Sequence, residues 1–179
     1  WNAFAYTETY YEGAYAYLAA VDAILSKAPA VNEPVTDAPG TEPTTEFVPV
    51  DRTLSLVEDY ADVLTDSEET DLLAKLEALG AANDIEVGVV TVDSHEGKDP
   101  QAFADDFYDY GGYGRTEDYD GMLFLWVNSE RTAYISTHGY CIYAVTDTGI
   151  DYIFDQMSYG LSGSDYYTAF TEYADSVDY

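Results

Sequence analysis

The chain contains 179 residues, with 35 acids against six lysines and arginines, and its formal net charge at pH 7 is -29. This length suits one ordinary domain plus some appended structure, and the 47% of hydrophobic residues indicates a packed core beneath an acidic surface. Such a surface repels phosphate backbones and anionic lipids, so neither nucleic-acid binding nor direct lipid binding by this fragment is expected.

The first 49 residues are expected to lie outside the main domain. Residues 1–28 are rich in tyrosine and alanine, and their apolar residues recur on one face, which predicts a helix. Residues 29–49 combine proline, threonine and glutamate, the composition of a semi-extended linker. We expect the helix to pack on the domain or on a partner, and its exchange onto a second copy would produce an oligomer.

The globular domain is expected over residues 50–179. The spacing of Thr65 and Glu68 predicts a capping box at the start of its first long helix. Four leucines lie on one face of that helix, and Gly80 is expected to close it. Residues 85–92, IEVGVVTV, then predict a strand that is buried on both faces.

The second half of the domain continues the alternation of helices and strands. Asp99 and Pro100 predict the cap and first turn of a helix that ends at the glycines from Gly111 onward. Residues 122–127 predict another buried strand, and residues 131–137 predict its antiparallel partner. Two more helices follow, with apolar faces formed by Ile150, Ile153, Phe154 and Met157 and by Tyr166, Phe170, Tyr173 and Val177. This order predicts the α/β class: an α/β/α layered sandwich with a small mixed sheet.

Cysteine content and hydropathy narrow the chemistry and the location. Cys141 is the only cysteine, which excludes an intrachain disulfide, a thiolate zinc cluster and a Cys-x-x-Cys redox pair. No apolar run approaches the roughly 20 residues that span a bilayer, and no basic and apolar signal pattern is present. Because the chain begins at Trp1 rather than at methionine, we expect it to be a processed or excised piece of a longer protein.

The stretch from Gly111 to Val127 places three acids, Glu117, Asp118 and Asp120, directly before a strand that is apolar throughout. Carboxylates at the mouth of a core strand suit cation capture, because ligands of α/β domains usually bind in crevices at strand ends.

Two further acids are expected to join this cluster, because they flank elements that pack against the same strands. The predicted metal ligands are Asp59, Asp118, Asp120 and Asp147, and oxygen ligands in that number favour Ca²⁺ or Mg²⁺ over zinc. In the alternative interpretation, Asp118 and Asp120 are turn residues, and Asp147 belongs to a helix cap behind Thr146.

Covalent chemistry has less support in the sequence. Ser136, His138 and Asp147 would form a hydrolytic triad on paper, but no nucleophile elbow accompanies them. No catalytic residue is assigned, and Arg131 is the single candidate, as one of six bases in an acidic chain. Its guanidinium is expected to pair with pocket carboxylates or to hold a phosphate oxygen, with a structural ion pair as the preferred interpretation.

Several segments, taken in this order, resemble the TPM domain family over about residues 50 to 179. They are Asp59 to Leu64 (DYADVL), IEVGVVTVDS, the stretch from Phe107 to Gly114, Asp120-Gly121, Arg131, and Val145-Thr146-Asp147. That family occurs in bacterial membrane-associated proteins and in a plant thylakoid-lumen protein connected with photosystem repair.

The resemblance implies an α/β/α fold, an acidic pocket that binds a divalent cation and, in some members, acid phosphatase activity. It also implies an extracytoplasmic domain of a membrane-associated protein, anchored outside this chain, that acts in assembly, repair or signalling with a membrane-protein partner. Many members have asparagine where this chain has Asp120, so the expected pocket is more acidic here. Two alternatives stay open: a metal-dependent phosphatase that hydrolyses phosphomonoesters, and a structural ectodomain without a bound ion.

Overall fold

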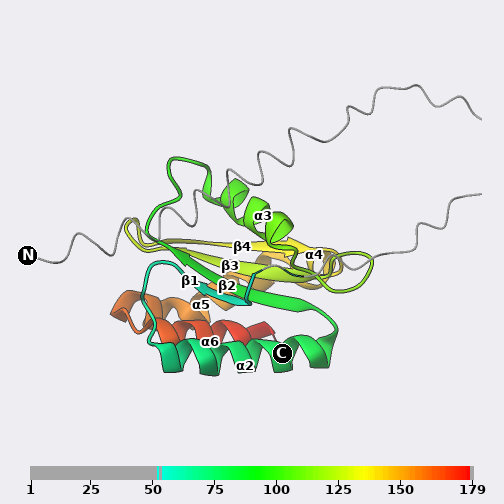
Figure 1. Cartoon of the computed structure of the whole chain (residues 1–179), viewed down its shortest axis with the longest axis horizontal. Helices are drawn as coiled ribbons and strands as arrows, with labels where there is room; N and C mark the ends of the chain where they lie inside the picture. The colour runs from blue at the N-terminus through cyan, green and yellow to red at the C-terminus, as the bar shows by residue number, and fades with distance from the viewer. Residues whose placement is uncertain (1–51, 53, 178–179) are drawn as a thin grey trace, which may run out of the picture. The chain divides into compact units, whose positions relative to one another are not determined.

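The computed structural model describes residue 52 and residues 54–177 (Figure 1). Its elements are, in chain order, β1 Val57–Asp59, α2 Asp66–Asn83, β2 Glu86–Val92, α3 Pro100–Gly111, β3 Gly121–Val127, β4 Thr132–His138, α4 Cys141–Ala144, α5 Asp147–Gly163 and α6 Tyr166–Val177. The helix predicted for residues 1–28 and the linker predicted for residues 29–49 lie outside the described residues and stay predictions.

The strands form one mixed sheet in the order β1-β2-β3-β4. β1, β2 and β3 run parallel, and β4 runs antiparallel to β3, as the predicted hairpin requires. Helix α3 lies over one face of the sheet, and α2, α5 and α6 cover the other (Figure 1). The predicted α/β fold with a small mixed sheet is confirmed.

Burial explains why β3 is apolar at every position. All seven of its residues are buried, because helices cover both faces of this inner strand. On the face covered by α6, the ring of Phe124 lies 5.5 Å from the rings of both Phe170 and Tyr173. On the face covered by α3, the rings of Tyr108 and Tyr113 pack at 5.7 Å. The aromatic core is therefore split between two layers, one on each side of the sheet.

The side-chain caps predicted from the sequence are present at the starts of α2 and α3. The backbone N–H of Glu68 donates to Thr65 Oγ1, and the Glu68 carboxylate accepts from the Thr65 N–H at 2.8 Å, which completes the predicted capping box. Asp99 accepts from the N–H groups of Gln101 and Ala102 at the start of α3.

Gly80 does not close α2, contrary to the prediction. The helix continues to Asn83, and Asp84 adopts the left-handed conformation at φ 57° and donates its N–H to the Gly80 carbonyl. A Cβ at Gly80 would lie 2.6 Å from the carbonyl oxygen of Ile85. The glycine thus permits the chain after the helix to pack closely against it, which is a different reason for its presence.

Helix α4 was not predicted from the sequence, because its four residues are too few to produce a periodic pattern. In residue 52 and residues 54–177, no helix combines the length and the apolar character that a membrane span requires.

Candidate functional site

The strand register separates the predicted metal ligands into two groups. Asp59, the last residue of β1, pairs with Thr91 near the end of β2, whereas Glu86 at the start of β2 pairs with Gly121, which follows Asp120. Thr91 lies five positions after Glu86 along β2, which corresponds to roughly 16 Å of strand. Asp59 and Asp120 therefore lie at opposite edges of the sheet, and the expectation that they converge on one ion is wrong.

At the carboxyl edge of the sheet, Asp59 organises the loop between β1 and α2. One of its oxygens accepts the Thr91 hydroxyl, and the other accepts the backbone N–H of Leu64 at 2.7 Å. The Thr91 hydroxyl in turn accepts the N–H of Ala61 at 3.1 Å. The next acid along the loop, Asp62, adopts the left-handed conformation at φ 51°. Asp59 thus fixes the loop that carries the chain from the sheet edge into α2.

Further carboxylates gather at this loop, and their charges act on Glu69. The pKa of Glu69 is raised above its ordinary value, first because the group is partly desolvated and then because of the negative charges of Asp59, Asp66, Asp62 and Glu58. Asp66 and Glu69 are three positions apart in α2, so they project from the same face of its first turns. A cation placed among these groups would relieve their mutual repulsion.

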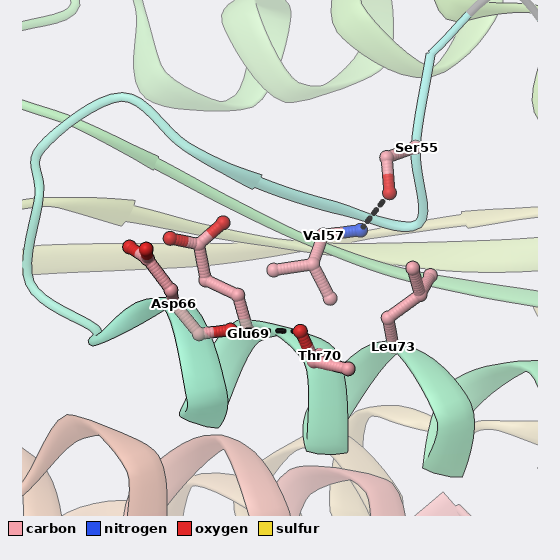
Figure 2. Close-up of a pocket in the computed structure, with 6 residues that line it drawn as sticks. All are labelled: Ser55, Val57, Asp66, Glu69, Thr70 and Leu73. Atoms are coloured by element: carbon pink, nitrogen blue, oxygen red, sulfur yellow. Dashed lines mark hydrogen bonds between the residues drawn. The ribbon is translucent and has the colours of Figure 1, made fainter.

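A shallow cavity opens beside these acids, with a volume of about 210 Å³. Its lining residues come from the segment before and within β1 and from α2: Ser55, Val57, Asp66, Glu69, Thr70 and Leu73. Figure 2 shows the carboxylates of Asp66 and Glu69 side by side, directed away from the helix axis toward the β1 side of the hollow. We call Asp59, Asp62, Asp66 and Glu69 the loop acids.

At the amino edge of the sheet, Asp120 serves as a turn residue. Its Oδ2 accepts the Thr116 hydroxyl at 2.6 Å, and its Oδ1 accepts the backbone N–H of Tyr140. A side chain at Gly139 would collide with this carboxylate, so the glycine is required for the close approach. These contacts clamp the turn before β3 to the turn after β4. The alternative interpretation of Asp120, as a turn residue, describes its hydrogen bonds.

The other two predicted ligands are exposed residues of turns and caps. The N–H of Asp118 donates to the Thr116 hydroxyl at 3.2 Å within the same turn. Asp147 is the first residue of α5, directly after the N-cap Thr146. There its negative charge interacts favourably with the positive end of the helix dipole. Across residue 52 and residues 54–177, no group of three or more His, Cys, Asp or Glu side chains is arranged to hold a metal ion.

The guanidinium of Arg131 faces the carboxyl end of α5. It donates to the carbonyl oxygen of Leu161 and, at 3.3 Å each, to the hydroxyl groups of Ser164 and Tyr166. It also lies over the ring of Trp126, 5.7 Å from the ring centroid. Arg131 thus adds a charged donor to carbonyl groups in the last turn of α5, rather than pairing with the predicted pocket carboxylates.

A hydrogen-bonded cluster connects β4 to α3, and it was not predicted from the sequence. The Ser136 hydroxyl lies 2.7 Å from Nε2 of His138 and 2.5 Å from Oδ1 of Asp105, and Nδ1 of His138 lies 3.8 Å from Asp109. The acids come from α3 and not from Asp147, the residue that the sequence placed with this pair. One signal was available: Asp105 and Asp109 are four positions apart on a helix, and Ser136 and His138 are two apart on a strand, so each pair shares a face.

This cluster is closed rather than catalytic in its geometry. Ser136 is only 1% exposed, so its hydroxyl is not accessible to an acyl or phosphoryl substrate. The His138 ring stacks on Tyr108 with centroids 3.7 Å apart. Burial lowers the pKa of His138, while the charges of Asp109 and Asp105 act in the opposite direction. The cluster joins a helix to the sheet edge.

Comparison with models of protein families identifies one family for this chain. The model of the TPM domain matches residues 57–179. No curated protein matches the chain.

Solved structures share the fold at low identity. The N-terminal domain of a P. gingivalis protein is 23% identical with a TM-score of 0.62, and the match covers 72% of this chain and 82% of that one. The N-terminal domain of a Corynebacterium glutamicum protein is 22% identical with a TM-score of 0.56, over 80% and 87% of the two chains. A protein of the psychrophilic bacterium Bizionia argentinensis is 16% identical with a TM-score of 0.58, over 64% and 79%.

The family match and the fold agree on the extent of the domain, from β1 to the end of α6. The segments in which the sequence resembles the family, from Asp59 to Asp147, all lie within the matched residues. This chain belongs to the TPM domain family.

Proposed function

We propose that this TPM domain binds a divalent cation at the loop acids beside the cavity between β1 and α2, and that it prefers Ca²⁺ to Mg²⁺. The observation that carries the proposal is the pair of carboxylates, Asp66 and Glu69, that lie side by side at the cavity. The pKa of Glu69 is raised first by burial and then by repulsion from neighbouring acids, among them Asp59 and Asp66. A bound cation would remove that repulsion, and oxygen ligands are the ones that Ca²⁺ and Mg²⁺ prefer.

The arrangement supports weak binding. Asp59 already uses both oxygens to hold the loop, so the remaining loop acids would have to reorient around an ion, which costs side-chain entropy. Affinity is then expected in the range of extracellular calcium modules, with a Kd of about 10⁻⁴ to 10⁻³ M. Ca²⁺ is favoured over Mg²⁺ because Mg²⁺ demands a near-ideal octahedral site and gives up its water reluctantly.

The proposed extracytoplasmic location rests on that weak affinity and on the resemblance of the sequence to the TPM domain family. A weak calcium site is useful only where calcium is abundant, which favours an extracytoplasmic domain of a membrane-associated protein. There the cation would stiffen the β1–α2 loop and its neighbours for contact with a membrane-protein partner during assembly, repair or signalling.

Calorimetric titration with CaCl₂ tests the cation site. The double variant Asp66→Asn/Glu69→Gln removes two negative charges at the cavity. The matched control, Asp118→Asn/Asp147→Asn, removes two at exposed positions elsewhere. We expect the first variant to weaken Ca²⁺ binding at least tenfold and the control to change it less than twofold. Equal weakening by both would mean that the acidic surface attracts calcium without a site. No heat from the wild type at about 10 mM Ca²⁺ would favour the structural ectodomain.

Hydrolysis of a chromogenic phosphomonoester, with and without Ca²⁺ or Mg²⁺, tests the phosphatase alternative. In that alternative the cation polarises the phosphoryl oxygens and activates water. We expect no metal-dependent turnover, because Arg131, the candidate charge stabiliser, contacts the carboxyl end of α5. Turnover that disappears in Asp66→Asn/Glu69→Gln and persists in the control pair would instead establish the enzyme.

A further inference from the structure

Three exposed side chains gather at the short helix α4, two on the helix itself and one, Tyr140, at its N-cap. The described residues contain seven large hydrophobic side chains that are exposed, and three of them, Tyr140, Ile142 and Tyr143, fall within four successive positions. Their exposed fractions are 64%, 56% and 80%. We call these three residues the α4 patch. Single exposed aromatic residues are common on protein surfaces, whereas a contiguous group points to an interaction site.

The backbone beneath the α4 patch is held in place. Cys141, between the first two patch residues, is only 2% exposed and anchors the helix to the domain. The N–H of Tyr140 donates to Asp120, and the preceding Gly139 packs directly against the same carboxylate. The backbone of the patch is therefore already ordered, so binding of a partner would cost little conformational entropy on this side of the interface.

The surroundings of the α4 patch are acidic. Asp118 and Asp120 belong to the turn that packs against Gly139, Asp109 lies beside His138, and Asp147 follows α4 at the start of α5. Arg115 is the base of this turn, and its side chain lies near Gly80 of α2. Aromatic rings within an acidic rim attract cations through both charge and cation–π contact.

We propose that the α4 patch is a docking surface for a cationic protein segment in which arginine or lysine alternates with apolar side chains. The basic groups would lie over the rings of Tyr140 and Tyr143 and face the acidic rim, and an apolar side chain would cover Ile142. Charge complementarity selects this occupant over a second copy of the chain, because two molecules that each carry a net charge of -29 repel one another.

Fluorescence anisotropy of a labelled twelve-residue peptide that alternates arginine and leucine tests this surface, with the full chain and with EDTA present. The variant is Tyr140→Ser/Tyr143→Ser. The matched control is Tyr152→Ser/Tyr159→Ser, which removes two tyrosines from α5 that are 49% and 83% exposed. We expect the first variant to weaken binding about tenfold and the control less than twofold. A peptide with glutamate in place of arginine should not bind.

Three outcomes would overturn the proposal. If both variants bind the peptide like the wild type, the tyrosines are not involved. If both weaken it equally, attraction is spread over the acidic surface. If sedimentation shows that the wild type is a dimer and that Tyr140→Ser/Tyr143→Ser is a monomer, the α4 patch is a contact between copies. Far-UV circular dichroism and the urea midpoint verify that each variant is folded, so weaker binding is not attributed to unfolding.

Discussion

The Ser136 hydroxyl lies within hydrogen-bond distance of both Nε2 of His138 and Oδ1 of Asp105, at 2.7 and 2.5 Å. A hydroxyl carries one proton, so the consistent arrangement has neutral His138 donating from Nε2 to Ser136, and Ser136 donating to Asp105. This chain of bonds connects β4 to α3 and holds the imidazole against Tyr108. In this arrangement neutral His138 is satisfied at Nε2, and burial lowers its pKa, which disfavours the charged form.

The two histidines should therefore titrate on opposite sides of the ordinary value. Burial lowers the pKa of His138, and the hydrogen bond to Glu130 at 2.9 Å raises the pKa of His95. Two-dimensional ¹H–¹⁵N NMR of the imidazole groups across pH 4 to 9 measures both, and His138 is expected to lose its proton first as the pH rises. Ser136→Ala should move the pKa of His138 while leaving that of His95 unchanged.

The sign of the effect on stability differs between the two groups. Because the folded pKa of His138 lies below its unfolded value, the unfolded state binds more protons, and stability is lost as the pH falls below the ordinary value of 6.5. The contribution of His95 is fully present below 6.5 and is lost as the pH rises through its raised folded pKa. A His138 pKa at or above that of His95 would show that the charges of Asp109 and Asp105 outweigh the burial of the imidazole.

Alanine at Gly139 should destabilise the domain more than alanine at Gly97. Both glycines have positive φ, 57° and 77°, so both substitutions introduce backbone strain of about 1 kcal/mol. Only at Gly139 would the new Cβ collide with Asp120, whereas nothing lies within 4 Å of a Cβ at Gly97. We expect a total loss of about 2–4 kcal/mol for Gly139→Ala, measured by urea unfolding. Equal losses at both sites would show that the Asp120 contact is not tight.

Arg131→Ala should lower stability by about 1–2 kcal/mol, because the carbonyl of Leu161 and its neighbours lose charged donors at the end of α5. Arg131→Lys should recover only part of this loss, since an ammonium group cannot reproduce the planar fork. Thermal unfolding measures both. If inorganic phosphate stabilised the wild type but not Arg131→Ala, the guanidinium would hold a phosphate oxygen instead.

Tyr173→Phe should be neutral or stabilising by up to about 1 kcal/mol. The Tyr173 side chain is fully buried, its hydroxyl has no hydrogen-bond partner within the described part of the chain, and its packing on Phe124 survives the change. The matched control is Tyr108→Phe, which removes a donor to the carbonyl of Tyr119 at 2.9 Å and should cost about 1 kcal/mol. A loss at Tyr173 as large as that at Tyr108 would reveal a partner for the buried hydroxyl.

Local chemistry in the sequence was sufficient for the elements that depend on neighbouring residues. The hydroxyl of Thr65 and the carboxylate of Glu68 satisfy each other's backbone donors within one helical turn, so their spacing alone locates the start of α2. The uninterrupted apolar run of β3 likewise predicted burial on both faces, because any exposed position would have favoured a polar residue. Gly80 misled the prediction, since its reason lies in contact with Ile85 across the turn.

The site depended on contacts that the sequence does not encode locally. Asp59 ends one strand and Asp120 precedes another, and only the parallel pairing of β1, β2 and β3 shows that these positions lie at opposite edges of the sheet. In the same way, Ser136 and His138 gained their acidic partners from α3 through packing across the sheet face. The sequence by itself determined the long helices of the domain and the buried strands β2 and β3, because those follow from periodicity and short-range capping, and its motifs indicated the family. Only the tertiary structure decided which carboxylates share a site, because strand direction and helix placement are properties of long-range pairing.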